Sequence, residues 1–278
     1  PVIRTLLDSM QGNDITLLMG IINGTTNYIL TKMTEEGQPY EKVLAEAQKL
    51  GYAEANPAAD VEGWDCVYKL SILASIAFHA RVNIDAIYRE GITGVTAEDI
   101  AIAKDLGYVI KLLAIGKKQD GNLEVRVHPT MLPKEHPLAT VSGVFNGIFL
   151  HGNAVDDIML YGRGAGQMPT ASAVVADVID ALKNGVKIHD SLFWQPADPV
   201  DGMLTDPAPA AYYVRVAGIA PAVVEAIYGY GKVVDERYEG CAYFVKRADE
   251  RALAEAARKV EAVGGSVKLV LKRLPEEV

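Results

Sequence analysis

The sequence contains few of the residues that build disulfide frameworks or metal sites. Its two cysteines, Cys66 and Cys241, lie far apart in 278 residues and form no CxxC spacing. Two such cysteines make neither a disulfide framework nor a zinc site, which favours a reducing, cytoplasmic compartment. Among the five histidines no pair has the spacing of metal ligands, and we assign none of them a role. The sequence therefore predicts no metal site in this chain.

Basic residues are also in the minority. Lysine and arginine number 27 against 36 aspartate and glutamate residues, so the formal net charge is −9 at pH 7. Nucleic acids and anionic membranes are bound through clustered basic residues, and we expect neither as a partner. No apolar run approaches the ~20 residues of a membrane-spanning helix, and no signal peptide pattern is found. These absences favour a protein that handles small molecules.

The composition and length favour two globular units. Half of the residues are hydrophobic, which is enough for a sizeable core. The best boundary is the segment 191–210, where prolines recur among small and polar residues. We therefore expect a first domain over 1–190, a linker over 191–210 and a second domain over 211–278.

Hydrophobic periodicity predicts helices and strands in the first domain. The run Ile15–Ile22 is typical of a buried strand, and Val61–Phe78 has the spacing of one long, largely buried helix. Thr96 is expected to cap a helix that ends near Leu106, and Asp120-Gly121 to turn a hairpin. Further expected elements are helices over Thr25–Glu36, Tyr40–Leu50 and about Thr170–Lys183, and strands over Tyr108–Lys117, Leu123–Met131, Val144–Leu150 and Asp157–Tyr161.

The second domain is expected to follow the order strand, helix, strand, strand, helix, strand. Its expected elements are Tyr212–Val216, Pro221–Tyr228, Val233–Tyr238, Ala242–Lys246, Glu250–Val263 and Ser266–Arg273. This order is the ferredoxin-like βαββαβ plan. The predicted fold class is therefore α/β (α+β): a mixed-sheet domain with packed helices, followed by a ferredoxin-like domain.

One segment gathers acidic residues around a lysine. Asp65 and Lys69 are four residues apart on the expected helix, so their side chains share one face. Glu54 and Asp60 precede them in a loop bent by Asn56-Pro57. Carboxylates can hold an ammonium group, and a partly desolvated lysine can exchange a proton with a carbonyl or alcohol oxygen. The alternative is a helix cap at Asp60 with a surface ion pair, which on spacing alone is the more common arrangement.

Two glycine-containing turns are suited to close approach by a ligand. Asn23-Gly24-Thr25-Thr26 joins an apolar strand to a helix and offers backbone N–H groups and two hydroxyls to a carboxylate or phosphate. Gly162, Gly164 and Gly166 precede the helix that begins near Thr170. Their spacing is not that of the dinucleotide-binding fingerprint. A purely structural turn is the alternative for both segments.

Three stretches, in this order along the chain, resemble the homoserine dehydrogenase family. They are GIINGTTNYILTKM (20–33), EAQKLGYAEANPAADVEGWDCVYKLSILA (46–74) and YGRGAGQMPTASAVVADVI (161–179). The resemblance implies a reversible reduction of L-aspartate 4-semialdehyde to L-homoserine with NAD or NADP as cofactor. This oxidoreductase reaction belongs to threonine and methionine biosynthesis.

The resemblance also implies roles for individual residues. Lys69 would donate a proton to the aldehyde oxygen, with Asp65 beside it. The residues that bind the substrate or line its pocket would be Glu54, Asp60, Tyr52 and Thr25. The family provides the hydride through its cofactor, so the protein must position an aldehyde and supply one proton.

The family has an amino-terminal Rossmann domain, and nothing before Pro1 is present in this sequence. We therefore expect a fragment that binds dinucleotide poorly and does not turn over by itself. In the family the segment 161–183 returns towards the nucleotide domain, so Gly162, Gly164 or Gly166 would touch the cofactor. A monovalent cation would be bound upstream of Pro1.

The second domain resembles an ACT domain, a small-molecule sensor found on amino-acid biosynthetic enzymes. Gly218-Ile219-Ala220-Pro221 stands where such domains bind an amino acid, with threonine as the candidate effector. The strands of the first domain suggest a sheet-to-sheet homodimer or a higher homo-oligomer. The alternative function is a non-catalytic module that forms dimers and senses threonine.

Overall fold

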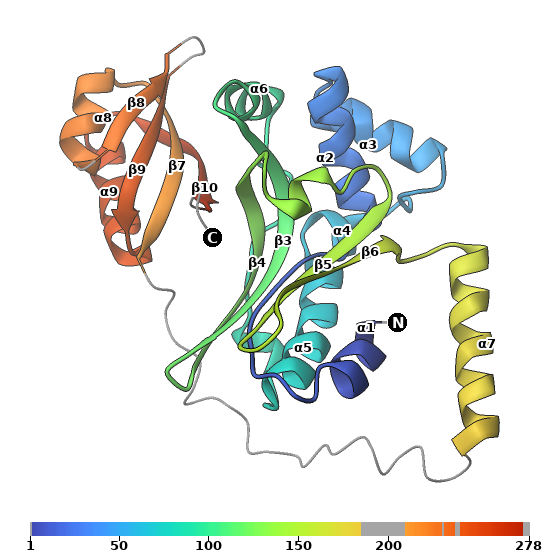
Figure 1. The fold of residues 1–278 in the computed structure, drawn as a ribbon. Coiled ribbons are helices and arrows are strands. Elements are labelled where there is room, and N and C mark those ends of the chain that lie inside the picture. The colour runs from blue at the N-terminus through green and yellow to red at the C-terminus, as the bar shows by residue number, and fades with distance from the viewer. Residues whose placement is uncertain (1, 185–208, 230, 237–239, 275–278) are drawn as a thin grey trace.

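The computed structural model describes residues 2–184, 209–229, 231–236 and 240–274. These residues form a central unit, a helix that stands beside it, and a C-terminal unit (Figure 1). The predicted linker 191–210 lies outside the described residues, except for its last two positions.

Ten strands of the described part form one mixed sheet. They are β1 (Ile15–Ile21), β2 (Tyr88–Arg89), β3 (Tyr108–Gln119), β4 (Asn122–Pro133), β5 (Phe145–Gly152), β6 (Asp156–Arg163), β7 (Ala210–Ala217), β8 (Gly231–Asp235), β9 (Cys241–Ala248) and β10 (Ser266–Arg273). Their order is β6-β5-β1-β3-β4-β10-β7-β9-β8, and the short β2 pairs with β4. Strands of the two units thus meet in a single sheet at β4 and β10.

The α-helices are α1 (Val2–Arg4), α2 (Gly24–Glu36), α3 (Tyr40–Lys49), α4 (Ala58–Val61), α5 (Trp64–Phe78), α6 (Ala97–Asp105), α7 (Gln167–Asn184), α8 (Pro221–Tyr228) and α9 (Glu250–Ala262). A π-helical turn (Thr5–Ser9) and two 3₁₀ turns, Ile84–Ala86 and Pro137–Thr140, complete the described helical segments. The predicted combination of a mixed sheet with packed helices is confirmed.

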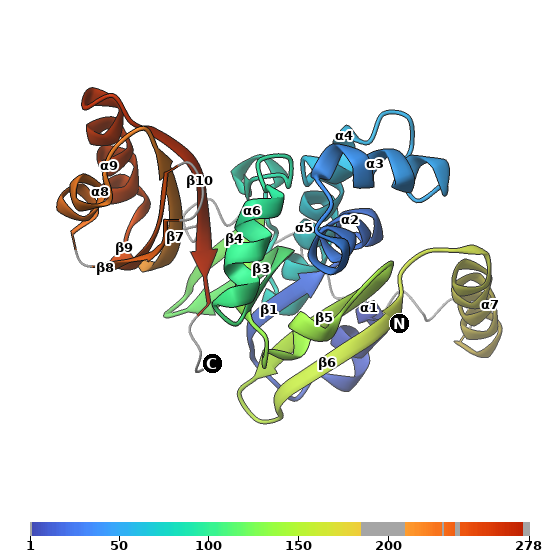
Figure 2. The same cartoon turned by 90° about the horizontal axis from the view of Figure 1, so that it is seen from above.

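The two faces of the central strands carry separate apolar clusters. Leu112 and Ala114 of β3 belong to the main core, together with buried residues of α2 and α5. The alternate residues Leu113 and Ile115 belong to a second cluster, which includes Leu138 of the 3₁₀ turn. This alternation follows from the two-residue period of a strand. Helices therefore cover one face of the central sheet, and α2, α4 and α5 meet near the end of β1 (Figure 2).

The predicted cap at Thr96 and the predicted hairpin turn at Asp120-Gly121 are confirmed, and a third local signal ends α2. Thr96 and Asp99 form a complete capping box at the start of α6. Asp120 and Gly121, both with positive φ (52° and 79°), turn the hairpin between β3 and β4. Gly37, with φ 65°, ends α2 in the left-handed conformation.

The predicted helix over Val61–Phe78 is confirmed from Trp64 onward, but its start is wrong, because the chain turns at Gly63. Gly63 has φ 86°, and it separates the single turn of α4 from α5. A Cβ at this position would lie 3.3 Å from Val127 Cγ1 and 3.4 Å from the Glu90 carbonyl oxygen. The positive φ therefore favours glycine, and the tight packing leaves little room for a side chain. The apolar periodicity continues through the turn, which is why the pattern alone did not reveal it.

The C-terminal unit has the predicted strand–helix–strand–strand–helix–strand order, β7-α8-β8-β9-α9-β10. Its strands lie in the order β10-β7-β9-β8, the arrangement of a ferredoxin-like sheet. Positions 237 and 238 of the third predicted element lie outside the described residues. The unit joins β4 through a short parallel pairing of β10, in which Lys272 faces Thr130 and Arg273 faces Met131.

A buried carboxylate reinforces this junction between the units. Asp99 of α6 is fully buried, and Arg215 Nε of β7 donates to its Oδ1 at 2.7 Å. Tyr213 Oη donates to the same oxygen at 2.9 Å. The other oxygen of Asp99 accepts from Thr96 within the capping box. One side chain therefore both starts a helix of the central unit and pairs with the C-terminal unit.

A buried lysine links the start of α2 to the sheet. Lys111 of β3 is 4% exposed, and its Nζ donates to Asn27 Oδ1 at 3.0 Å and to the Val141 carbonyl at 2.7 Å. Asn27 in turn donates to the Phe145 carbonyl at 3.0 Å. Burial lowers the pKa of Lys111 to about 8, because the charged ammonium is removed from water without a carboxylate in contact.

This depressed pKa predicts a pH-dependent stability. Between pH 8 and the ordinary lysine pKa of 10.5 the unfolded chain binds more protons than the folded one, so Lys111 becomes less destabilising as the pH rises. We expect the stability of the wild type relative to Lys111→Met to rise by up to about 1.4 kcal/mol per pH unit in this window. Denaturant unfolding from pH 7 to 10.5 measures it. Lys117→Met, at an exposed position of the same strand, is the matched control. A flat difference for Lys111→Met would contradict the prediction.

Candidate active site

The candidate site is built around Asn23, the residue that follows the end of β1 and caps α2. Its Oδ1 accepts from the backbone N–H of Thr26 at 2.9 Å, which fixes the first turn of the helix. Its Nδ2 donates to Asp60 Oδ1 at 2.7 Å and to Asp65 Oδ2 at 2.9 Å. One buried amide therefore holds two carboxylates that come from different helices, α4 and α5.

Lys69 completes this cluster from the next turn of α5. Its Nζ donates to Asp65 Oδ2 at 2.7 Å and to the Ile22 carbonyl at 3.1 Å. The spacing of Asp65 and Lys69 predicted a shared face, and the structure brings the two side chains into contact. They are 31% and 48% exposed, so the pair is anchored to the protein on one side and open to solvent on the other.

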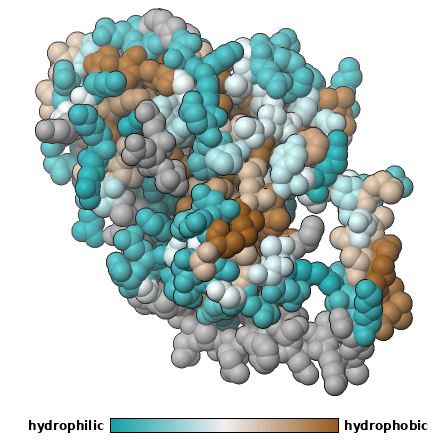
Figure 3. All heavy atoms as spheres, viewed as in Figure 1, coloured by the Kyte–Doolittle hydropathy of each residue, from teal (hydrophilic) through white to brown (hydrophobic). Residues whose placement is uncertain are grey.

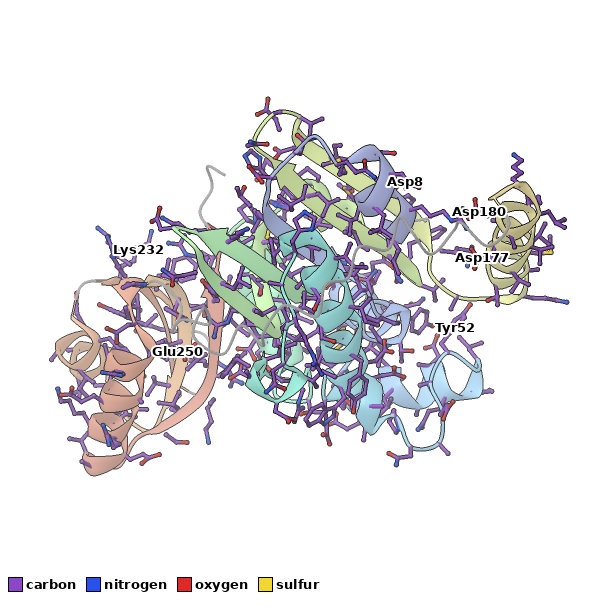
Figure 4. The ribbon with its side chains drawn as sticks, turned by 90° about the horizontal axis from the view of Figure 1, so that it is seen from below. Asp8, Tyr52, Asp177, Asp180, Lys232 and Glu250 are labelled. Atoms are coloured by element: carbon purple, nitrogen blue, oxygen red, sulfur yellow. The ribbon has the colours of Figure 1, made fainter. Side chains whose placement is uncertain are left out.

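The other predicted substrate residues, Thr25, Tyr52 and Glu54, differ from one another in their contacts. Thr25 Oγ1 donates to the Tyr52 carbonyl at 2.7 Å, which ties the loop after α3 to the start of α2. The Tyr52 ring lies 4.9 Å from that of Tyr28 and is partly exposed (Figure 4). Glu54 is exposed, and its carboxylate contacts no partner among the described residues. The structure therefore joins Asp60, but not Glu54, to the Asp65–Lys69 pair.

The glycine turn after β6 reaches the same region through Asn146, a residue that the sequence pattern did not single out. Asn146 lies on β5 opposite Gly162, and its Nδ2 lies 3.5 Å from the Ile22 carbonyl. A Cβ on Gly164 would lie 2.1 Å from Asn146 Nδ2, so a side chain there would displace the amide. Gly166, with φ 118°, stands at the start of α7 instead. Gly162 and Gly164, more than Gly166, therefore lie beside the end of β1.

Asn146 also has an unused acceptor. Its Oδ1 is buried and finds no hydrogen-bond partner among the described residues. A buried polar atom without a partner costs free energy, and in native proteins it often marks a ligand position. Asn146 is therefore a further candidate for contact with a bound molecule.

Other reactive groups in the described part of the chain are less suited to chemistry. Burial raises the pKa of the Cys66 thiol to about 12, so it is not a thiolate near neutral pH. Within residues 2–184, 209–229, 231–236 and 240–274, no three or more His, Cys, Asp or Glu side chains gather as metal ligands would. None of the helices described there has the length and apolar character needed to cross a membrane.

Comparisons with known proteins all indicate the same family. The family model described as homoserine dehydrogenase matches residues 1–179. A homoserine dehydrogenase of Synechocystis sp. is 53% identical over 186 residues, which cover 66% of this chain and 43% of that protein. One from Pseudomonas aeruginosa is 43% identical over 222 residues, or 78% of this chain and 51% of that protein.

Solved structures agree. A homoserine dehydrogenase from Thiobacillus denitrificans superimposes with a TM-score of 0.89 at 36% identity, covering 99% of this chain and 67% of that one. The Staphylococcus aureus homoserine dehydrogenase at pH 6.5 gives 0.77 at 32% identity, covering 95% and 65%. This chain belongs to the homoserine dehydrogenase family. It spans about half the length of the curated relatives named above.

From these contacts we predict that a single added charge, in Asn23→Asp, lowers the stability of the fold strongly. Asn23→Asp keeps an acceptor for the helix cap but removes both donated hydrogen bonds and places three carboxylates together. We expect a loss of about 2–3 kcal/mol of stability at pH 7, and a smaller loss near pH 4, where carboxylates take up protons. Urea unfolding at both pH values measures it.

The matched control is Asn83→Asp. Asn83 caps the 3₁₀ turn Ile84–Ala86 through the Asp85 backbone N–H, at an exposed position away from the cluster. This change should cost less than about 0.5 kcal/mol. Equal losses for the two variants would show that the cap, and not the carboxylate cluster, determines the effect.

Proposed function

We propose that this chain carries the substrate-binding and proton-donating part of a homoserine dehydrogenase, which interconverts L-aspartate 4-semialdehyde and L-homoserine. One observation supports the proposal above the others. A lysine ammonium has three N–H donors, and Lys69 uses two of them, on Asp65 and on the Ile22 carbonyl. The third remains for an oxygen on the solvent side, which is where an aldehyde would accept a proton.

In this proposal Lys69 is the proton donor and Asp65 its positioning residue. The carboxylate of Asp65 favours the charged ammonium, and the Ile22 carbonyl fixes its direction. As the carbonyl carbon is reduced, negative charge develops on its oxygen, and Lys69 transfers a proton to that oxygen. In the reverse direction neutral Lys69 takes the proton from the alcohol.

The substrate's ammonium group would bind Asp60. One oxygen of Asp60 accepts from Asn23, which leaves the second for the ligand. Glu54 would be the second carboxylate, reaching in from its exposed loop, and Thr25 and Tyr52 would line the same side of the pocket. The distance between the ammonium group and the aldehyde would then be set by the separation of Asp60 and Lys69 on neighbouring helices.

A nicotinamide cofactor fits the region of Gly162 and Gly164. Gly164 leaves no room for a side chain beside Asn146, and the unpartnered Oδ1 of Asn146 offers an acceptor to a carboxamide or ammonium group. A bound NAD(P)H would supply the hydride. A related archaeal homoserine dehydrogenase structure is a complex with NADPH, at 29% identity.

The decisive test replaces Lys69 with methionine. The chain is joined behind the amino-terminal portion of the Synechocystis relative, and NADPH oxidation is followed with L-aspartate 4-semialdehyde. Lys69→Met should lower kcat about 10²–10⁴-fold because the proton donor is lost. Lys32→Met breaks an equivalent i,i+4 pair with Glu36 on α2 and should leave the rate unchanged. Full activity in Lys69→Met would refute its role, and an inactive parent fusion would count against the proposed reaction.

We also propose that α7 packs against a nucleotide-binding domain. Met168, Val175, Val178 and Leu182 recur at helical spacing on α7 and are 53–81% exposed. Figure 3 shows their brown side chains along the helix, which stands apart from the body. The opposite side is held by Arg4, which pairs with Asp177 at 2.8 Å and with Asp180 at 3.0 Å (Figure 4).

This packing predicts a context-dependent effect of Leu182→Glu. In the 278-residue chain Leu182 is exposed, so the melting temperature should stay within about 1 °C. In the fusion protein the same charge would be buried, and the melting temperature should fall by several degrees. Lys183→Glu, the neighbouring exposed position, should leave both proteins unchanged. Equal behaviour of Leu182→Glu in both proteins would contradict the packing.

For the remaining parts of the molecule we propose an ACT-like regulatory role of 211–278 and pairing of two chains. The βαββαβ order of the C-terminal unit supports the former, with threonine bound at Gly218–Pro221 as the proposed effector. The position of β6 at the end of the sheet supports pairing, because its outer edge has no partner strand among the described residues. Such a dimer-forming, threonine-sensing module is the second candidate function.

A further inference from the structure

The segment between α3 and α4, residues 50–57, carries two of the proposed substrate residues, Tyr52 and Glu54. It contains no helix or strand and follows α3, which lies beside α2 (Figure 1). An irregular segment has no regular ladder of hydrogen bonds, so the direction of its side chains depends on the contacts that hold its backbone. The two halves of this segment are held by different neighbours.

The first half of the segment, up to Ala53, is fixed at several points. The backbone N–H groups of Tyr52 and Ala53 donate to the Ala47 carbonyl at 2.9 and 3.2 Å. The Ala53 side chain is buried in the main core. Thr25 Oγ1 donates to the Tyr52 carbonyl, and the Tyr52 ring lies beside that of Tyr28. The position of Tyr52 is therefore set by α2 and by the end of α3.

The second half of the segment is held by one side chain, that of Gln48 in the last turn of α3. Its Nε2 donates to the Glu54 carbonyl at 3.1 Å and to the Ala55 carbonyl at 3.4 Å. An amide nitrogen carries two N–H groups, so each carbonyl can receive one of them. Glu54 and Ala55 make no other hydrogen bond to a described residue. Gln48 is thus the contact that joins this half to the rest of the described part of the chain.

This contact fixes the direction in which Glu54 leaves the backbone. The peptide group before Glu54 is held through Ala53, and the carbonyl that follows its Cα is held through Gln48. Because each residue has only two soft backbone dihedrals, fixing both neighbouring peptide groups fixes the Cα–Cβ direction of Glu54. The exposed carboxylate itself has no described partner. Its aim therefore depends on its backbone, and the backbone depends on Gln48.

We propose that Gln48 is a positioning residue for substrate recognition, which directs the Glu54 carboxylate towards the ammonium group of the substrate. The inference rests on the proposed function, in which Glu54 and Asp60 share that ammonium group. Asp60 is held through its carboxylate by the amide of Asn23, and Glu54 is held through its backbone carbonyl by the amide of Gln48. A carboxylate on an ordered backbone loses less conformational entropy when it binds, so the contact strengthens binding.

Two ligands, one with the ammonium group and one without it, test this role. The fusion protein is assayed for oxidation of L-homoserine, and 4-hydroxybutanoate, which is homoserine without its amino group, is the competitive inhibitor. Gln48→Met keeps the length of the side chain and removes both N–H donors. It should raise the KM for L-homoserine about fivefold or more, because two residues of the segment lose their anchor. The kcat should stay unchanged, since the ammonium group does not react.

The Ki of 4-hydroxybutanoate separates positioning from general damage. This inhibitor has no ammonium group for Glu54 to hold, so Gln48→Met should leave its Ki within about twofold of the wild type. A disturbance of the whole pocket would raise the Ki and the KM together. Lys49→Met is the matched control, because Lys49 is exposed on the same turn of α3 and should change neither constant. Melting curves confirm that each variant is folded.

A double variant shows whether Gln48 acts through Glu54. Glu54→Gln should itself raise the KM for L-homoserine, and adding Gln48→Met to it should raise the KM by less than about twofold more. An equal effect of Gln48→Met with and without the Glu54 carboxylate would overturn the proposal. An unchanged KM in Gln48→Met, or a parallel rise in the Ki of 4-hydroxybutanoate, would do the same.

These outcomes differ from a failure of the proposed function. A wild-type fusion that does not oxidise L-homoserine would refute the reaction, and the inference about Gln48 with it. An active fusion in which Gln48→Met behaves as the wild type would overturn the role of Gln48 alone and leave the proposed role of Lys69 in place.

Discussion

The geometry of the candidate site depends on one side-chain amide, that of Asn23. Asn23 lies just after the end of β1. Its Oδ1 accepts a hydrogen bond from the first turn of α2, and its Nδ2 donates to the carboxylates of Asp60 and Asp65. Asp60 and Asp65 would repel each other without a shared donor, because both are partly removed from water. Asp65 then holds Lys69, whose ammonium also returns to the carbonyl beside Asn23. Asn23, Asp65, Lys69 and the Ile22 carbonyl thus form one closed hydrogen-bonded ring, to which Asp60 is attached through Asn23.

The junction between the two units also depends on a small number of contacts. Among the described residues the backbone contributes the short pairing of β4 with β10 and the hydrogen bond from the Leu274 N–H to the Met131 carbonyl, so side chains must supply the rest. On one side Asp99 binds Arg215 and Tyr213 while it caps α6, and on the other Arg126 binds Glu250. The Asp99–Arg215 pair is largely removed from water, and Arg126 is buried although Glu250 is 42% exposed. Losing the partner of a buried charge is costly because it leaves that charge uncompensated.

Local features of the fold were readily predicted from the sequence, and the contacts that build the site were not. The capping box at Thr96, the hairpin turn at Asp120 and the Asp65–Lys69 pair each depend on residues within four positions of one another. Asn23 meets Asp60 and Asp65 across 37 and 42 positions, and Asn146 meets Ile22 across 124. No periodic pattern records such contacts.

The departure from the predicted helix at Gly63 has a tertiary origin. Gly63 interrupts an apolar periodicity that continues on both sides, with φ 86° and with Glu90 and Val127, distant in sequence, packed against it. Glu54 was grouped with Asp60 because they are near in sequence, and its carboxylate contacts no described partner, so its role at the substrate stays a prediction. Tertiary packing decides where such a turn falls, and local spacing does not reveal it.

Hydrogen bonds at two positions, one helical turn apart, fix the start of α2. They explain how a partly exposed site can stay ordered. Asn23 is fixed by the two aspartates, and Asn27, one turn later, is fixed by Lys111 and by the Phe145 carbonyl. Desolvation of Lys111 is unfavourable, as its lowered pKa shows. That cost is consistent with a positioning role, since Lys111 anchors the helix from the sheet side and leaves its open side to a ligand. Such support suits the proposed role of Lys69, because a small displacement of a proton donor weakens proton transfer more than binding.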